Sequence, residues 1–455
     1  MGRLRSRFHR ASLPVEKKKF LKVGLPLVLA VVMGTGMWLY VQLVLIPYQK
    51  TQASIGQSPR GNLSDLYPRW LGTRELLLHQ RDPYGADITR EIQIGYYGRP
   101  LSATRPHDPK DQQGFAYPIY VVLMLAPTIT LPFSTVNAAF FWLLAGFTAA
   151  AVPLWLRTLG WRCSTTGLLI WIVLAVSCFP AIQALKLRQL MLLVAVLLAG
   201  SMTAVVRGRL VLAGVLLALA TIKPQLVFLL MAWLCIWVLG NWPERRRLLW
   251  SFGVTITILV CAGEFLLPGW MREFGLAIED YYRYTGGATS LLDVLLSPGL
   301  GGATAVALVA IVLVFAWKNR RVRQETLAFQ WLLCFTLTTT LLVIPRFAPY
   351  NQLLLLPAVM MAVRARHPLW AKGRFSRFFY AITALSISWP FFAAAGLVIA
   401  LAWLPGPTVQ KAWGLPFYPS FAIPITLYAL LLIASKVVTD QDSMRTGSDE
   451  AVFSG

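Results

Sequence analysis

The sequence predicts an all-α membrane protein that crosses the bilayer many times. Of its 455 residues, 57% are hydrophobic and only 13% are charged, whereas a soluble domain is about 45–50% apolar and about one-quarter charged. Apolar runs recur along nearly the whole chain, and about 20 apolar residues are enough to span a bilayer core. Lys and Arg outnumber Asp and Glu by 42 to 19, and in such a protein the excess marks cytoplasmic loops. The composition therefore excludes a nucleic-acid binder and a cytosolic enzyme.

A basic segment precedes the first apolar run and orients the chain. Residues 1–19 hold several Lys and Arg and a single acid, Glu16. The apolar stretch that follows, about 20–46, is too long for a signal-peptide core and ends without a small-residue cleavage motif. We therefore predict that residues 1–19 are cytoplasmic, that this stretch is the first span, and that the chain from residue 47 onward lies outside.

The remaining apolar runs set the expected number of spans. They lie at about 117–133, 136–157, 164–185, 189–206, 210–222, 225–240, 250–267, 302–317, 327–345, 349–363, 378–404 and 419–436. If all of them crossed, the basic segments 318–323 and 364–377 would lie outside, against the positive-inside rule. The run 117–133 is short and interrupted by prolines, so we predict a re-entrant or surface helix there. About twelve spans then form one transmembrane domain, residues 20–436, with both termini cytoplasmic.

Three polar segments accompany the predicted spans. Residues 47–116 form a long first outer loop, whose leucines at near-helical spacing predict short amphipathic helices on the membrane surface. Residues 268–300 form a second outer loop. Residues 437–455 are polar and acidic, so we predict a disordered cytoplasmic tail.

Four cations interrupt apolar sequence on the predicted outer side: Lys186, Arg188, Lys223 and Arg346. Charges at membrane depth are costly and usually serve a site. Any one of them alone could instead end a helix and extend to the lipid headgroups. Together they suit the phosphate of a lipid, because an arginine can bind two phosphate oxygens at once.

Asp65 follows the predicted first span in the segment Ser64–Tyr67. Two roles are open to it: the N-cap of a surface helix, or a carboxylate that faces the cationic cavity. The cysteines and histidines show no metal-ligand spacing, so we expect no metal site. These residues alone do not separate an enzyme from a transporter of an anionic lipid.

Several short motifs, taken in order, resemble one enzyme family. They are S-D-L-Y at 64–67 with R-D-P-Y at 81–84, F-A-Y-P at 115–118 with L-P-F at 131–133, R-Q at 188–189, and the segment from A-G at 213–214 to K-P at 223–224. Their order resembles the polyprenol-phosphate-sugar-dependent glycosyltransferases of the GT-C superfamily, specifically family 87 with its α-mannosyltransferase members. Two positions depart from that pattern: Ile119 replaces a second proline, and Arg188 replaces a glycine.

The resemblance implies a GT-C-type bundle with the activity of a membrane hexosyltransferase. Asp65 matches the general base of the family, which would take a proton from the acceptor hydroxyl. The cations Arg188, Lys223, Arg346 and Lys186 would bind the donor phosphate, and Gln189, Tyr84, Tyr67 and Tyr282 are candidate donor or acceptor contacts. Tyrosines near a membrane surface can equally be interfacial anchors.

The implied substrates and location complete this expectation. The donor would be a sugar on a polyprenyl phosphate, with mannose the commonest sugar of the family, and the acceptor would be a glycolipid or glycan. Transfer would proceed by a single inverting displacement on the outer face of the plasma (inner) membrane, without a metal or other cofactor. A lipid-linked glycan flippase or transporter is the alternative, although we see no internal repeat of the kind that many transporters have.

Overall fold

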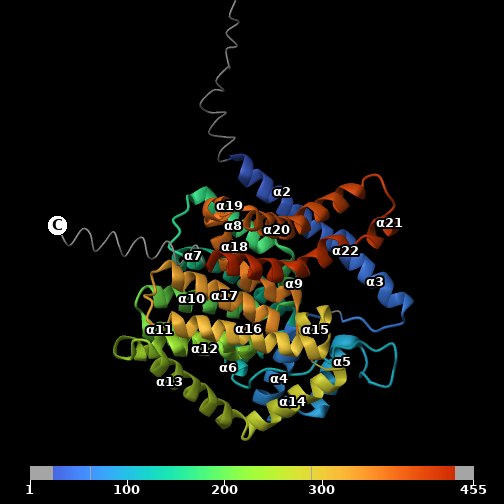
Figure 1. Cartoon of the computed structure of the whole chain (residues 1–455). Helices are drawn as coiled ribbons and strands as arrows, with labels where there is room; N and C mark the ends of the chain where they lie inside the picture. Colours follow the sequence, from blue (N-terminus) through green and yellow to red (C-terminus); the bar gives the residue numbers. More distant parts are fainter. Residues whose placement is uncertain (1–23, 62, 288, 436–455) are drawn as a thin grey trace, which may run out of the picture.

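The described part of the protein is built entirely from helices (Figure 1). The computed structural model describes residues 24–61, 63–287 and 289–435; of these residues 78% are helical and none forms a strand. The predicted all-α class is therefore confirmed. The basic segment 1–19 and the acidic tail 437–455, for which we predicted cytoplasmic locations, lie outside the described residues.

Several helices are long and apolar enough to cross a membrane. Six of them are found among the described residues: Leu25–Ile55, which joins α2 (Leu25–Tyr40), the π-helical η2 (Val41–Leu45) and α3 (Ile46–Ile55); α7 (Phe133–Thr158); α13 (Trp242–Leu266); α16 (Pro298–Lys318); α20 (Arg374–Ala400); and Gly406–Ser435, which includes α21 (Gly406–Lys411), α22 (Gly414–Phe417) and η6 (Tyr418–Phe421). A seventh candidate is α8 (Thr165–Ser177) with α9 (Phe179–Leu187), bent by 56° where Pro180 opens α9. The chain is thus a multi-pass membrane protein.

Shorter apolar helices also belong to the bundle, some of them buried and others partly exposed. They are α10 (Met191–Val206), α11 (Leu210–Leu219) with η4 (Ala220–Ile222), α12 (Pro224–Leu239) and α17 (Leu327–Val343). α17 is buried along almost its whole length, because α12, α16 and α18 (Leu356–Arg364) pack around it. Each falls short of the roughly 20 residues that span a bilayer unaided. The expected total of about twelve spans therefore stays a prediction.

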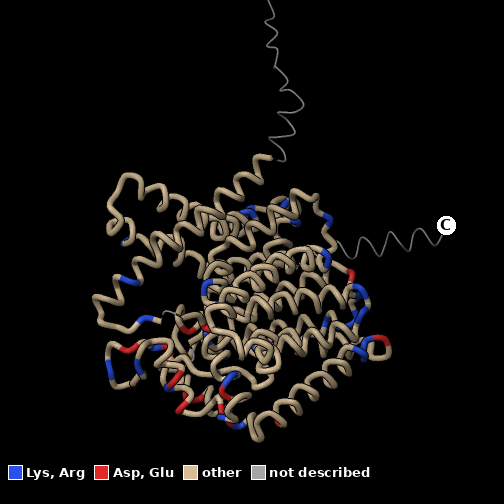
Figure 2. Tube along the Cα trace, turned by 180° about the vertical axis from the view of Figure 1, so that it is seen from behind, with Lys and Arg blue, Asp and Glu red and all other residues tan. Residues whose placement is uncertain are grey.

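Lys and Arg are concentrated at one edge of the bundle, on the right of Figure 2. Arg245, in the first turns of α13, donates hydrogen bonds to the carbonyls of Trp237 (2.7 Å), Arg320 (2.8 Å) and Val322 (2.9 Å). Arg364, at the end of α18, donates to the carbonyl of Leu159 just past α7. The basic loops are thus tied to one another and to the helix ends beside them.

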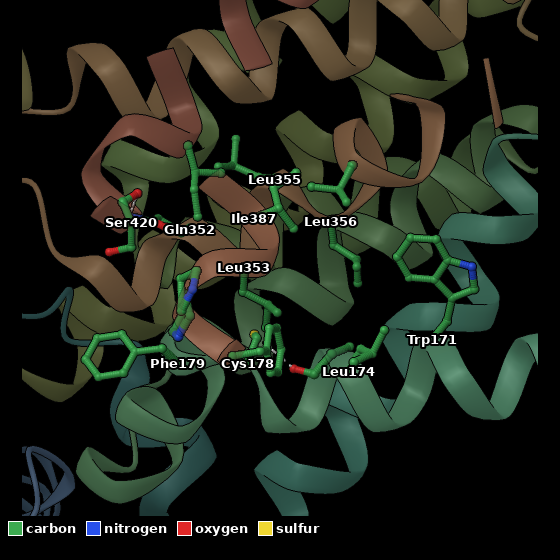
Figure 3. A pocket seen from close by; sticks show the side chains of 16 residues that line it. Trp171, Leu174, Cys178, Phe179, Gln352, Leu353, Leu355, Leu356, Ile387 and Ser420 are labelled. Carbon is green, nitrogen blue, oxygen red and sulfur yellow. Dashed lines mark hydrogen bonds between the residues drawn. The ribbon is translucent and has the colours of Figure 1, made fainter. Parts of the chain in front are cut away.

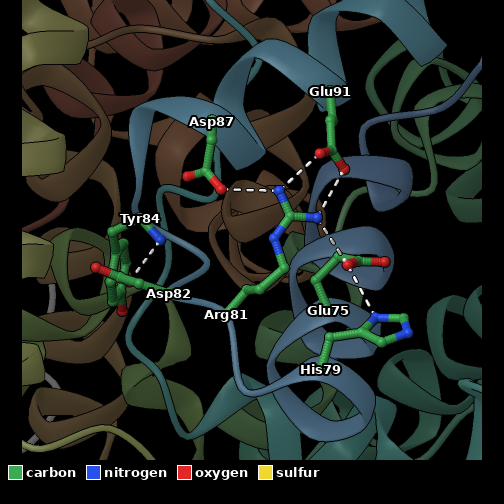
Figure 4. A network of polar contacts seen from close by, with 7 residues as sticks. All are labelled: Glu75, His79, Arg81, Asp82, Tyr84, Asp87 and Glu91. Atoms are coloured by element: carbon green, nitrogen blue, oxygen red, sulfur yellow. Dashed lines mark hydrogen bonds and ion pairs between the residues drawn. The ribbon is translucent and has the colours of Figure 1, made fainter.

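Acidic and basic residues mix in a second region, formed by α4 (Leu66–His79), α5 (Ala86–Tyr97) and α14 (Trp270–Thr285) (Figures 1 and 2). Arg81 joins the first two of these helices by donating to Glu75 (3.0 Å), Asp87 (2.7 Å) and Glu91 (2.6 Å), as Figure 4 shows. Because Asp65 directly precedes α4 and Tyr96 lies on α5, this network also fixes the two segments that carry these side chains.

The segment 117–133 contains no long helix. It forms only α6 (Val121–Leu125) and η3 (Ala126–Thr128), both too short to cross a bilayer. The segment is held in the interior, since the Trp70 indole donates to the Thr128 carbonyl (3.2 Å) and the Tyr120 hydroxyl to the Thr221 carbonyl (2.9 Å). The first span, in contrast, continues to Ile55, past its predicted end at residue 46.

Three short helices complete the description. α15 (Leu291–Leu295) lies between α14 and α16 and begins with a capping box made by Ser290 and Asp293. η5 (Pro349–Leu355) continues directly into α18, and α19 (Arg366–Ala371) connects α18 to α20. Of these, η5 is the one that positions the site, because it follows the Pro345–Pro349 segment that bears Arg346.

Candidate active site

Asp65 immediately precedes α4, but its carboxylate does not cap that helix. Its backbone is in the α-helical region (φ −64°, ψ −6°), whereas an N-cap side chain that reaches the first free amides needs a more extended residue. Its backbone N–H donates to the Leu187 carbonyl at 2.9 Å, which ties the start of α4 to the end of α9. The alternative interpretation of Asp65 as a side-chain N-cap is therefore wrong.

The Asp65 carboxylate instead accepts hydrogen bonds from three side chains. Gln189 donates to Oδ2, while the Tyr96 hydroxyl (3.3 Å) and the Gln113 amide (3.5 Å) reach Oδ1. These donors come from the α9–α10 junction, from α5 and from the segment before α6. Three distant parts of the chain thus converge on one carboxylate, which is an arrangement typical of a functional side chain rather than of a local turn.

Lys223 approaches the same carboxylate through Gln189. It lies between η4 and α12, where Pro224 opens α12 and leaves residue 223 outside helical geometry. Its ammonium donates to the Gln189 Oε1 atom at 2.8 Å and lies 5.6 Å and 5.3 Å from the ring centres of Tyr117 and Tyr350. The side chain is 7% exposed, so its charge is held by an amide and two aromatic faces instead of by water.

Two arginines complete the positive side of the site. Arg346 lies over the Tyr281 ring at 4.7 Å, and its Nη1 atom is buried without a hydrogen-bond partner among the described residues. Arg69, one turn into α4, lies over Tyr117 at 4.6 Å and donates through Nη1 to the Asp65 carbonyl at 2.6 Å. Both guanidinium groups thus stack on aromatic rings and keep donor atoms unused.

These side chains line one cavity of about 590 Å³. Its polar and aromatic lining consists of Asp65, Arg69, Tyr96, Asp111, Gln113, Tyr117, Gln189, Lys223, Gln225, Phe274, Tyr281, Tyr282, Arg346, Phe347, Tyr350 and Asn351. A cavity of this size fits a small organic ligand, because ligand sites usually measure about 300–1,000 Å³. The structure therefore brings together the carboxylate and two of the four cations that the sequence singled out.

Asp111 is a second acid in this cavity. Its Oδ2 atom accepts from the Gln113 amide at 2.8 Å, and its Oδ1 atom from the Tyr281 hydroxyl at 3.5 Å. Gln113 thus donates to both acids and holds them apart. Neither acid forms a direct ion pair with a described cation of the cavity.

Burial raises the pKa of the Asp65 carboxyl above the usual range of an aspartic acid. The positive charge of Arg69 acts against this rise, the negative charge of Asp111 adds to it, and Lys223 and the Gln189 hydrogen bond lower the pKa by smaller amounts. The side chain still keeps some exposure because it faces the cavity. A buried carboxylate with a raised pKa is a stronger proton acceptor than an exposed one.

Tyr96 keeps its proton beside this carboxylate. Burial raises the pKa of its hydroxyl far above the usual tyrosine value, and the charge of Asp65 raises it further. The hydroxyl therefore acts as a hydrogen-bond donor to Asp65 rather than as a base.

Two of the predicted phosphate ligands point away from the cavity. Arg188 adopts a left-handed backbone conformation at the end of α9 (φ +50°), and its guanidinium donates to the carbonyls of Asn137 (3.1 Å), Leu185 (3.0 Å) and Lys186 (2.9 Å). Lys186 lies instead near the charges of Arg60 and Lys50. The structure thus places neither side chain on the cavity lining.

The candidate contact residues divide in the same way. Gln189 and Tyr282 line the cavity. Tyr84 donates its hydroxyl to the Tyr117 carbonyl at 2.7 Å and supports the wall from behind. Tyr67 packs against Trp70 and Phe133.

Several lining residues are not among those that the sequence singled out for this site: Arg69, Tyr96, Asp111, Gln113, Tyr117, Tyr281, Tyr350 and Asn351. Tyr117 belongs to the F-A-Y-P motif, so that motif carried a signal for it. Asp111 and Gln113 directly precede the motif, in the last polar residues before apolar sequence begins. Arg69 follows Asp65 at helical spacing, a pattern that places both on one face of α4.

A separate apolar pocket of about 140 Å³ lies at the bend between α8 and α9 (Figure 3). Trp171, Leu174 and Cys178 form one side of it, and Leu353 and Leu356 form the other. The helix η5 thus separates two cavities, because its Tyr350 and Asn351 line the polar cavity while Leu353 faces the apolar pocket.

The fold and site together define a multi-pass membrane protein with two carboxylates and three cations around one cavity. Residues 115–345, just over half of the chain, match the family model described as Glycosyltransferase family 87. The chain therefore belongs to this family, as the motif order predicted, and is a membrane glycosyltransferase. No curated protein and no solved structure matches the chain significantly. The matched stretch includes Gln189, Lys223 and Tyr281, whereas Asp65 and Arg346 lie outside it.

Proposed function

We propose that the protein transfers a hexose, with mannose the first sugar to test, from a polyprenyl phosphate to a glycolipid or glycan acceptor. The observation that carries this proposal is the joint lining of one cavity by Asp65, Lys223 and Arg346. A carboxylate suits the proton of an acceptor hydroxyl, and cations suit the phosphate of a leaving group. The family match supports sugar transfer as the reaction.

The proposed reaction is a single displacement. The acceptor oxygen attacks the anomeric carbon while Asp65 takes the hydroxyl proton, and the bond between that carbon and the phosphate oxygen breaks. Its electron pair leaves with the polyprenyl phosphate. One displacement inverts the anomeric configuration, and a phosphate leaves without being protonated, so one carboxylate is sufficient. Glycoside hydrolases, in contrast, use two.

Lys223, Arg346 and Arg69 are the proposed phosphate ligands. Negative charge grows on the departing phosphate, and preorganised cations in a largely enclosed site stabilise it strongly. We do not include Arg188 or Lys186 among these ligands. The guanidinium of Arg188 donates to backbone carbonyls, and Lys186 does not line the cavity. Because these cations supply the stabilising charge, we propose that transfer needs no metal or other cofactor.

Polar atoms without partners support a ligand that carries both a phosphate and hydroxyl groups. Among the described residues, Arg346 Nη1 and Arg69 Nε are buried donors without an acceptor, and Gln113 Oε1 and Asn351 Oδ1 are buried acceptors without a donor. All four belong to residues that line the cavity. A phosphate accepts from the first pair and a sugar hydroxyl donates to the second, so a glycosyl phosphate satisfies both kinds of atom.

The distribution of charge supports an active site on the outer face of the plasma membrane. The basic loops around Arg245 and Arg364 lie where α13 begins and α7 and α18 end, whereas the cavity is lined from the start of α12 and from the η5 segment. The positive-inside rule assigns the basic loops to the cytoplasm. Sugars on polyprenyl phosphates are the donors that serve the face where nucleotide sugars are absent.

The test is a transfer assay with purified protein, radiolabelled polyprenyl-phosphate mannose and a mannosyl glycolipid acceptor, with a chelator present throughout. We expect a new glycosidic bond from the wild type and a loss of about 10²–10⁴-fold in Asp65→Asn, the usual contribution of a general base. The matched control is Glu279→Gln, an exposed acid on α14 that pairs with Arg283.

Two outcomes of this assay would overturn the proposal. Asp65→Asn protein that is stably inserted and transfers at the wild-type rate removes the assigned base. Movement of the labelled lipid across proteoliposomes without any new linkage identifies a flippase, the alternative that the sequence left open.

A further inference from the structure

A second polar cavity of about 410 Å³ adjoins the candidate active site. α5 and α14 form its sides, and the segment 112–116 separates it from the catalytic cavity. Both cavities are lined by Gly114, Ala116 and Tyr281. The boundary between them is therefore only one segment of chain thick.

The separating segment presents a different glutamine to each side. Gln113 lines the catalytic cavity and donates to Asp65 and Asp111, while Gln112 lines the second cavity. Gln113 has a left-handed backbone (φ +52°), which non-glycine residues rarely adopt. Since its side chain is 4% exposed and bonded to both acids, the surrounding contacts hold this unusual conformation in place.

The second cavity is held open by buried polar contacts. Gln93 on α5 is 7% exposed; its amide donates to the Gln112 carbonyl at 3.0 Å and accepts from the Leu101 N–H at 2.9 Å. These two bonds tie two lining segments of the cavity to the same side chain. The space is therefore part of the folded structure of this region and not a gap between loosely placed loops.

The lining of the second cavity combines flat aromatic faces with hydrogen-bonding groups. Tyr84, Phe115 and Tyr281 supply the rings, and Thr89 and Arg90 supply hydrogen-bonding groups. Asp280, of opposite charge to Arg90, also lines it. A sugar ring has an apolar C–H face and a rim of hydroxyls, and tyrosine offers the matching ring and polar edge. A neutral polyhydroxylated ligand suits this balanced charge better than an anion.

The space beside Gly114 allows a ligand to approach both cavities. A side-chain carbon at this position would meet only Thr89, at 3.8 Å and 3.9 Å. Ala116, two residues on, is also small. The shared boundary thus has small residues at two positions that line both cavities, which leaves room for a chain of sugars to place neighbouring units on its two sides.

We propose that the second cavity binds a sugar unit of the acceptor, next to the unit whose hydroxyl reaches Asp65. The inference rests on the proposed transferase function and specifies its acceptor as a glycan of two or more sugar units. Gln113 then serves the acceptor unit in the catalytic cavity, where its Oε1 atom has no donor among the described residues. The residues that line only the second cavity determine how well the enzyme selects a longer acceptor.

The first test compares acceptors of different length. We would measure transfer from polyprenyl-phosphate mannose to methyl α-mannoside and to a linear α-mannotriose, with the wild type, Ala277→Trp and Leu276→Trp. Ala277 lines the second cavity, and its neighbour Leu276 on α14 is exposed and does not. We expect Ala277→Trp to raise the KM for mannotriose about tenfold, the value of one or two lost polar contacts. The KM for the donor and for methyl α-mannoside should be unchanged in both variants.

The second test does not require turnover. Asp65→Asn protein leaves the second cavity intact, so it should still bind linear trisaccharides of mannose, glucose or galactose in saturation-transfer NMR. The additional change Ala277→Trp should weaken that binding about tenfold. Binding of no trisaccharide, or binding that Ala277→Trp leaves unchanged, would overturn the inference.

The two proposals fail in distinguishable ways. If the wild type transfers sugar equally well to short and long acceptors, and Ala277→Trp behaves like Leu276→Trp, the second cavity is not an acceptor site although the enzyme is a transferase. If the wild type transfers sugar to neither acceptor and the trisaccharides bind, the proposed donor is wrong while the carbohydrate site stands.

Discussion

Arg245 and Arg346 lie in different regions of the bundle, and their surroundings show how one kind of side chain can hold a fold or serve a site. Arg245 is 5% exposed, donates to three backbone carbonyls at 2.7–2.9 Å and stacks on Trp237 at 4.0 Å. Arg346 stacks on Tyr281 at a similar distance, but its Nη1 atom has no partner among the described residues. The first uses its donors within the protein, and the second keeps a donor for a ligand.

The cavity region also keeps its acids and cations apart. Gln189 lies between Lys223 and Asp65, and Gln113 lies between Asp65 and Asp111. A direct ion pair would lower the pKa of the carboxyl and occupy the cation at the same time. Amide side chains avoid both effects, because they transmit hydrogen bonds without adding charge. The carboxylate therefore stays basic and the cations stay available.

The largest effect on kcat in the comparison of the two arginines is expected for a substitution of Arg346. Arg346→Gln should lower kcat by about 10²–10³-fold, the usual cost of removing one preorganised group that stabilises developing charge. The thermal unfolding midpoint should change little, since this guanidinium makes few bonds to the protein. Steady-state transfer assays and melting of the detergent-solubilised protein measure both. If the variant unfolds at a lower temperature and retains its kcat, Arg346 stabilises the fold, as Arg245 does, and does not serve the reaction.

The next effect tests the separation of acids from cations. In the proposed mechanism, transfer requires the unprotonated form of Asp65, and burial raises the pKa of this carboxyl. As pH falls through that raised pKa, kcat/KM should drop about tenfold per pH unit, and the drop should begin at a higher pH than for an ordinary aspartate. Gln189→Glu places a second acid beside Asp65 and should move the drop to still higher pH. If Gln189→Glu leaves the pH at which kcat/KM falls unchanged, the group whose protonation causes the fall is not Asp65.

A smaller effect is expected where an arginine only holds the fold. Arg245→Met should destabilise the protein by about 3 kcal/mol, because it leaves buried carbonyls without their charged donor. The activity per folded molecule should stay at the wild-type level, since the cavity is lined by other elements. Lower kcat in the fraction that remains folded at low temperature would contradict this division of roles.

The sequence predicted the helical class and the family, and it singled out Asp65 and Lys223, which the structure places on one cavity. Apolar composition and span-length runs identify a membrane bundle, because a lipid environment leaves few alternatives to helices. Asp65 and Lys223 stood out because each is a charge in or beside apolar sequence. The spans were harder to count, since short helices such as α10 and α17 are as apolar as true spans while the surrounding bundle buries them.

The rest of the site could not be predicted from local pattern. Asp111 and Gln113 belong to a polar segment whose path depends on contacts with α5 and α14, and no spacing in the sequence encodes such contacts. Tyr281 and Tyr350 lie far apart in the sequence and converge only when α14 and η5 pack against the bundle. Arg188 shows the converse: as a charge within apolar sequence it was a predicted phosphate ligand, whereas the structure pairs its guanidinium with backbone carbonyls.

The smallest effect is expected for Arg188, and it tests directly whether this side chain is a phosphate ligand. Arg188→Gln removes a charge from a guanidinium that lies 5.0 Å from the Phe141 ring and donates to carbonyls of α7 and α9. We expect kcat and the donor KM to change less than about threefold, because mutations away from a site have modest effects. The matched comparison is Lys223→Gln, which removes a charge from the cavity itself and should lower kcat far more. Equal losses of kcat in the two variants would mean that Arg188 turns toward the phosphate when the donor binds and is a further phosphate ligand.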